Sequence, residues 1–144
     1  MDNATIDRKI AELVMGWKWH RMGRRYTLAS DGAFHPTFMR DHGIEVVDAP
    51  PTDIDTDTVI DATGVKKYST DPAADYEVLV KVRETWDRAQ FMRFCAELAD
   101  IAIGRSSWVS RGDDEVCGMY QPGDYAKAAL RAVGVETGEK DANL

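Results

Sequence analysis

The chain has 144 residues, the length of a single domain, and its 44% hydrophobic and 30% charged residues are typical of a globular protein. A net charge of −7 excludes a general nucleic-acid binder, which needs a basic surface. No apolar run is long enough to cross a membrane, and the charged N-terminus lacks the apolar core of a signal peptide, so we expect a cytosolic protein without a membrane partner.

Charge is divided unevenly along the chain. Residues 1–30 hold six Lys or Arg against three Asp or Glu, whereas residues 31–65 hold one against eight. The sequence therefore predicts a basic N-terminal third beside an acidic insert, and a local cationic pocket for a small anion is compatible with this total.

Helical spacing of apolar residues predicts one helix over residues 5–15 and three helices in the second half of the chain. Their expected ends are Asn3 or Thr5 to Gly16, then Ser69, Thr70 or Asp71 with Pro72 in the first turn, then Thr85 to Gly104, and finally Gly123 or Asp124 to Gly134. Residues 105–120 are expected to form a polar loop or short strand, and residues 136–144 a frayed tail.

Short strands are predicted between the first and second helices. Aromatic and charged side chains alternate over residues 17–28, which indicates a half-buried hairpin with its turn at Met22–Gly23. Further strands are expected at residues 34–39 (on a sheet edge because of Pro36), 44–47 and 58–62, with an acidic variable loop at 48–57.

This order of elements predicts an α+β fold: a small antiparallel sheet sandwiched by helices in one domain over residues 1–144. An antiparallel sheet is expected because strands do not alternate with helices, as the crossovers of a parallel sheet require.

Residues of the kinds that carry catalysis or bind metals occur in unfavourable settings. The histidines His20, His35 and His42 lack the regular spacing of metal ligands, so we expect no metal. Asp61 is better explained by a strand-ending turn, and Cys95 by the apolar face of a helix. Cys95 and Cys117 are expected to be core thiols, with a disulfide as the alternative. The sequence therefore predicts neither catalytic residues nor a cofactor.

Arg21, Arg24 and Arg25 lie close in sequence to Trp19 and Tyr26, and this group is the first candidate for a ligand site. Arginine makes bidentate contacts with phosphate, and aromatic rings stack on bases, so the combination suits a nucleotide. The alternative is a sheet with one charged face and one aromatic face.

Two further groups could hold an anion. Lys127 and Arg131 are four residues apart on the last predicted helix, so both cations project from one side as a clamp or as a solvated face. Tyr68 precedes a helix start with exposed hydroxyl and N–H groups, although Asp71 competes for those donors by capping the helix.

Three blocks occur in order along the chain: VMGWKW from Val14, YSTDPAADYEVLVKV from Tyr68 and YQPGDYAKAALRAVG from Tyr120. Together they resemble the phage ABA sandwich family, small proteins of phage and prophage genomes. The chain departs from the family's usual blocks at Pro72, at Tyr76 and at the start of the last block.

The resemblance implies an α/β sandwich and, through similarity to Thoeris anti-defence sponges, sequestration without catalysis. In such a protein a homo-oligomer holds a cyclic nucleotide or cyclised ADP-ribose at subunit interfaces. Lys127 and Arg131 would contact phosphates, with Arg21 to Arg25 supplied by a neighbouring subunit. The alternatives are a phage protein that inhibits a host enzyme through the loop at 48–57 and, less favoured, a signal-degrading enzyme.

Overall fold

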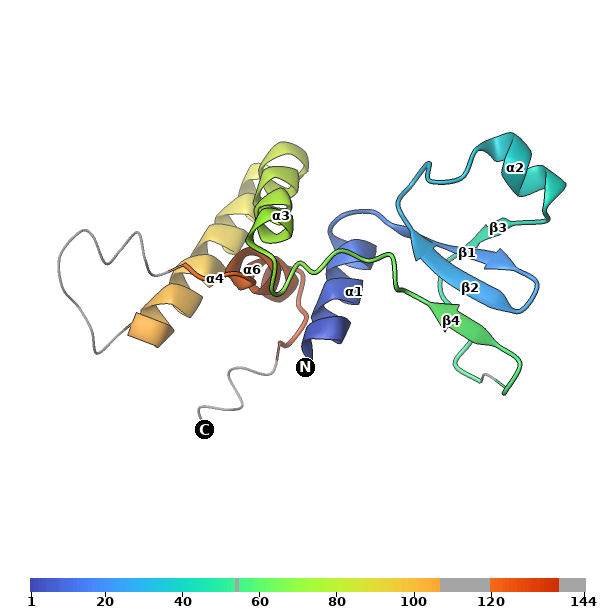
Figure 1. Cartoon of the computed structure of the whole chain (residues 1–144). Coiled ribbons are helices and arrows are strands. Elements are labelled where there is room, and N and C mark those ends of the chain that lie inside the picture. The colour runs from blue at the N-terminus through green and yellow to red at the C-terminus, as the bar shows by residue number, and fades with distance from the viewer. Residues whose placement is uncertain (54, 107–119, 138–144) are drawn as a thin grey trace.

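The structure of the chain, a computed structural model, describes residues 1–53, 55–106 and 120–137. It confirms the α+β class, with an N-terminal helix, a four-stranded sheet and then further helices (Figure 1). The elements are α1 (Asn3–Leu13), β1 (Lys18–Met22), β2 (Arg25–Ala29), α2 (Pro36–Asp41), β3 (Glu45–Val47), β4 (Val59–Asp61), α3 (Pro72–Thr85), α4 (Arg88–Ser106) and α6 (Asp124–Ala132).

The sheet is mixed, with strand order β3-β1-β2-β4. The predicted antiparallel pairing holds for β1 with β2 and for β1 with β3, but it is wrong for β2 with β4, which run parallel. A parallel pair needs a crossover connection, and the chain provides one through α2 and β3. This crossover was not predicted from the sequence, because the segment that forms its helix, α2, was predicted to be a strand.

That misread segment is residues 34–39, where the structure has the helix α2. Pro36 occupies the first turn, where a helix does not need the N–H that proline lacks. The Nδ1 atom of His35 accepts a hydrogen bond from the N–H of Thr37 at 3.1 Å and so caps the helix. The same proline that was expected to hold a strand at the sheet edge therefore starts a helix.

The predicted helix ends are confirmed at Gly16 and Gly134, but the end predicted at Gly104 is wrong, because α4 continues to Ser106. Asp2 caps α1 by accepting from Thr5 N–H at 2.8 Å, in place of the predicted caps. Gly16 ends this helical segment in the left-handed region, at φ +78°, as predicted.

The break between α3 and α4 lies where it was expected, but its cap differs. Asp87 accepts from the N–H of Gln90 at 2.8 Å and caps α4. The hydroxyl of Thr85 instead donates back to the carbonyl of Lys81 at 2.6 Å, inside α3.

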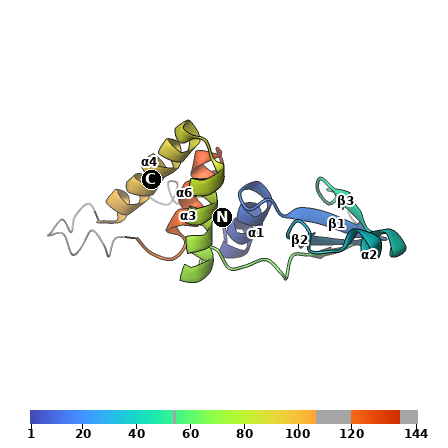
Figure 2. The same ribbon diagram turned by 90° about the horizontal axis from the view of Figure 1, so that it is seen from above.

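α3, α4 and α6 gather on one side of α1, and the sheet extends from the other side together with the short helix α2 (Figures 1 and 2). α6 packs against α4, α3 and α1, and the sheet reaches this core through Trp19 and Leu28. The helices therefore do not enclose both faces of the sheet, unlike the predicted sandwich. Among the described residues no helix has both the length and the apolar character that a membrane span requires.

Some expectations fall outside the described part of the chain. Residues 107–119, including Cys117, contain most of the predicted loop or strand at 105–120, and residues 138–144 contain most of the predicted tail. Thr137, at the start of that tail, is buried and accepts from Nε of Arg131 at 3.3 Å.

Candidate functional site

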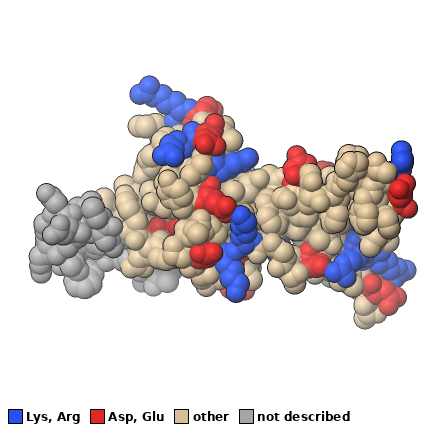
Figure 3. Space-filling view, turned by 45° about the horizontal axis from the view of Figure 1, so that its top comes forward, with Lys and Arg blue, Asp and Glu red and all other residues tan. Residues whose placement is uncertain are grey.

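The three hairpin arginines are each paired with carboxylates from the acidic insert. Figure 3 shows the outcome on the surface, where basic and acidic side chains lie side by side over the sheet. The pairs are Arg21 with Glu45, Arg24 with Asp55 (2.9 Å) and Asp57 (3.3 Å), and Arg25 with Asp61 (2.5 Å). The uneven charge along the sequence is therefore largely balanced within the fold. The carboxylates of the acidic insert neutralise the arginines of the hairpin beside which the insert packs.

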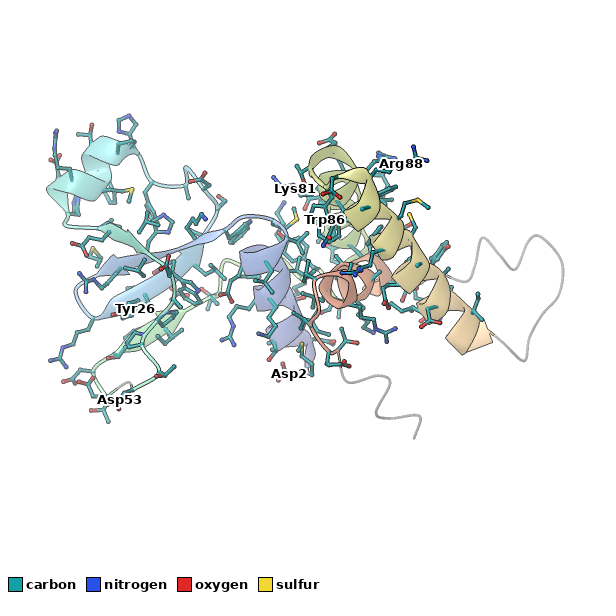
Figure 4. The ribbon with its side chains drawn as sticks, turned by 180° about the vertical axis from the view of Figure 1, so that it is seen from behind. Asp2, Tyr26, Asp53, Lys81, Trp86 and Arg88 are labelled. Atoms are coloured by element: carbon teal, nitrogen blue, oxygen red, sulfur yellow. The ribbon has the colours of Figure 1, made fainter. Side chains whose placement is uncertain are left out.

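Strand register also separates these arginines. Arg21 lies opposite Tyr26 in the β1–β2 pair, whereas Arg25 lies opposite Met22, so the two guanidinium groups project from opposite faces of the sheet. Glu45, by its hydrogen bond and its charge, raises the pKa of Arg21, and Tyr26 adds to the shift. The structure therefore brings Arg21 and Tyr26 together, as Figure 4 shows for the position of Tyr26 over the sheet, but not all three arginines.

Two aromatic residues of the predicted ligand sites, Trp19 and Tyr68, belong to the core. Trp19 is 3% exposed, and its Nε1 donates to Glu12 Oε2 at 3.1 Å, which ties the sheet to α1. Tyr68 is 1% exposed, and burial raises its pKa to about 12. Neither ring presents a face to a ligand in this conformation.

Lys127 and Arg131 lie on α6, in the helical part of the molecule, and both are half-buried. The sheet lies on the far side of α1 from this helix (Figure 1). One chain therefore does not bring this pair together with the hairpin arginines, and a site using both groups would need a second subunit.

A groove that the sequence did not indicate runs between the side of α1 and the segment that leaves β4. Its volume is about 300 Å³, at the lower end of the range for small-ligand pockets. Its polar lining comprises two cations, two hydroxyls and one carboxylate: Arg8, Lys67, Thr5, Thr63 and Asp7. The carboxylate of Asp7 accepts a hydrogen bond from the N–H of Ser69 at 2.8 Å, and the two cations outnumber this one carboxylate in the lining.

A second hollow of about 320 Å³ adjoins the first and shares Lys67 with it. Lys66, which also lines the second hollow, pairs with Glu77 at 2.8 Å. In the groove itself Arg8 makes a longer contact of 3.7 Å with Glu12, one helical turn away. Lys66 and Lys67 are adjacent in the sequence. Their position near α1, however, depends on a long-range contact of the fold, which spacing along the sequence does not reveal.

Buried carboxylates hold the start of α6. Asp75, 2% exposed, accepts from the N–H groups of Ala126 (2.9 Å) and Tyr125 (3.3 Å). Burial raises the pKa of Asp75 to about 6, although these backbone hydrogen bonds oppose the shift. A perturbed carboxyl can mark an active site, but this one caps a helix in the interior.

The remaining candidates have local structural roles. Asp61 closes a turn by accepting from the hydroxyl (2.6 Å) and N–H (3.0 Å) of Thr63, and these bonds lower its pKa. His20 lies edge-on to the ring of Phe34, and Cys95 is a free thiol in α4. Within residues 1–53, 55–106 and 120–137, no group of three or more His, Cys, Asp or Glu is placed to bind a metal.

Comparison of the chain with known protein families, characterised proteins and solved structures found no match. The resemblance to the phage ABA sandwich family therefore stays a prediction.

Proposed function

We propose that this protein binds a small phosphate-bearing ligand of the nucleotide class and holds it without chemical change. The setting implied by the resemblance is a phage or prophage protein that removes a cyclic nucleotide immune signal from the host cytosol. The observation that supports binding most directly is the groove beside α1, where Arg8 and Lys67 line one hollow.

The composition of the groove suits phosphate better than carbon-rich ligands. Guanidinium and ammonium groups provide charge-assisted donors for phosphate oxygens. The longer contact of Arg8 with Glu12 leaves that guanidinium easier to recruit than Arg21, Arg24 or Arg25, whose closer carboxylates a ligand would have to displace.

The size of the groove limits what it can enclose. About 300 Å³ accommodates a phosphate or diphosphate with part of a sugar, and the adjoining hollow at Lys67 extends the site. A base would then lie outside the groove. A neighbouring subunit contributing Lys127 and Arg131 would complete the site in an oligomer.

The test is uptake followed by release. Purified protein is incubated with a panel of cyclic nucleotides and cyclised ADP-ribose, separated from free ligand by gel filtration and heated, and the released compounds are analysed by mass. We expect one compound to return intact in an amount comparable to the protein. Return of an altered compound would indicate an enzyme, and absence of any uptake would contradict the nucleotide proposal.

A further inference from the structure

The cationic groove beside α1 also contains a carboxylate. Ala4, Asp7 and Arg8 line it from one face of α1, because residues three and four apart in a helix are neighbours on its surface. Lys67 lines it from the segment that follows β4. One group that can only accept hydrogen bonds therefore shares the lining with two cations that can only donate them.

The fold uses one of the two oxygens of the Asp7 carboxylate. Its Oδ1 accepts from the N–H of Ser69 at 2.8 Å and so ties α1 to the turn before α3. Over the part of the chain that the structure describes, Oδ2 makes neither a hydrogen bond nor an ion pair. The neighbouring Arg8 makes its ion pair with Glu12, at 3.7 Å. The groove thus presents a carboxylate oxygen that the fold itself does not require.

This oxygen disfavours a ligand that offers the groove only phosphate. A carboxylate and an ionised phosphate repel each other, and neither has a proton to share. A ligand with hydroxyl groups beside its phosphate avoids this cost, because a hydroxyl donates to the carboxylate while the phosphate contacts the cations. Ribose phosphates carry both groups, and an acidic side chain on a ribose hydroxyl is a known mode of nucleotide recognition.

We propose that Oδ2 of Asp7 accepts a hydrogen bond from a sugar hydroxyl, so that the groove selects a ribose phosphate over inorganic phosphates. This inference rests on the proposed function, because it assigns the sugar-binding residue of the same site. The groove volume of about 300 Å³ accommodates a phosphate with a sugar ring, and Ala62 and Val65 in its lining offer apolar contact to the ring carbons. Asp7 is then the residue that determines specificity, and the cations supply most of the affinity.

The experiment compares two phosphate monoesters by calorimetric titration of the whole protein. Ribose 5-phosphate carries the sugar hydroxyls, whereas tetrahydrofurfuryl phosphate has the same ring and phosphate without any hydroxyl. Inorganic pyrophosphate is the third ligand and reports on the cations alone.

The variant is Asp7→Asn, which keeps a carbonyl oxygen for the N–H of Ser69 but removes the negative charge. The matched control is Asp100→Asn, which removes the same charge from an exposed residue of α4. Far-UV circular dichroism checks that both variants are folded. The comparison of the two monoesters on the unmodified protein needs no variant, so it tests the proposal even if Asp7→Asn does not fold.

A hydrogen bond to a charged group corresponds to a change in affinity of about tenfold or more. We therefore expect the unmodified protein and Asp100→Asn to bind ribose 5-phosphate at least tenfold more tightly than tetrahydrofurfuryl phosphate. In Asp7→Asn this preference should largely disappear, and pyrophosphate should bind more tightly than to the unmodified protein because the repulsion is gone. A purely structural role of Asp7 would not produce that gain.

Equal affinity of the unmodified protein for the two monoesters would overturn the inference. A preference for ribose 5-phosphate that persists in folded Asp7→Asn would overturn it as well, because the hydroxyl would then bind elsewhere. In both cases bound pyrophosphate would leave the proposed function standing. Absence of binding by all three ligands would contradict the proposed function and this inference together.

Discussion

The carbonyl oxygen of Ser69 lies so close to Gly123 that a Cβ atom on the glycine would sit 2.4 Å from it. Ser69 also donates its N–H to Asp7 of α1, so this one residue connects the turn before α3 with α1 and with the start of α6. The approach is possible because glycine adopts φ +95° and has no side chain.

Gly123→Ala should therefore destabilise the fold by about 3 kcal/mol or more, because a clash with backbone adds to the strain of a positive φ. The matched control is Gly134→Ala, where φ is +90° but no atom lies within 4 Å of the added Cβ. The control should lose only about 1–2 kcal/mol. Urea unfolding measures both, and equal losses would show that the Ser69 contact is not tight.

The Trp19–Glu12 hydrogen bond predicts a second pair of variants. Glu12→Ala leaves the buried Nε1 of Trp19 without its acceptor and should cost about 1–2 kcal/mol of the free energy of unfolding. Glu12→Gln keeps a side-chain oxygen at the same position and should lose much less. If both variants unfold at the same urea concentration, the bond does not stabilise the junction of sheet and helix.

Asp75 predicts a pH dependence of stability. Its pKa in the folded protein, about 6, lies above the ordinary value of 3.8, so the protonated form favours the folded state. Its contribution is complete below about pH 4 and is lost as the pH rises through 6, and it amounts to roughly 2–3 kcal/mol.

Comparison with Asp75→Asn isolates this effect, because asparagine keeps a hydrogen-bond acceptor but does not titrate. Urea unfolding at several values between pH 4 and pH 7.5 should show the unmodified protein losing stability relative to the variant as the pH rises. A difference that stays constant across this range would show that Asp75 titrates normally.

Several features of the fold were predictable because their signals are local. Gly16 and Gly134 marked helix ends through a backbone conformation that glycine adopts readily, and Pro72 with Asp71 marked the start of α3. Pro36 was ambiguous because proline suits both an edge strand and the first turn of a helix. That single ambiguity concealed the crossover and with it the parallel pairing of β4.

The candidate site was harder to predict because it depends on pairing across the fold. Arg21 and Arg25 are close in the sequence, yet strand alternation places them on opposite faces, and each already has a carboxylate partner. Arg8 and Lys67 are far apart in the sequence and line one groove. Charge spacing along the chain reveals neither relationship.

In the proposed site the groove binds phosphate and a neighbouring subunit contributes α6. Reversing the two charges of α6 should therefore affect a whole nucleotide and inorganic pyrophosphate differently. Lys127→Glu with Arg131→Glu should weaken uptake of a whole nucleotide at least tenfold if a neighbouring subunit contributes these residues. It should leave the binding of inorganic pyrophosphate unchanged, because neither residue lines the groove. Loss of pyrophosphate binding in this folded variant would place the phosphate site on α6 instead.

Calorimetric titration with inorganic pyrophosphate tests the groove most directly. The proteins compared are the unmodified chain, Arg8→Glu with Lys67→Glu, and the control Arg83→Glu with Arg88→Glu, which changes the net charge equally on exposed residues of α3 and α4. Figure 4 shows Arg88 at the far end of the helices from Asp2 and the start of α1. We expect saturable binding by the unmodified chain and the control, and at least a tenfold loss in the groove variant. Equal binding by all three proteins, or no binding by the unmodified chain, would contradict the assignment of the groove as the phosphate site.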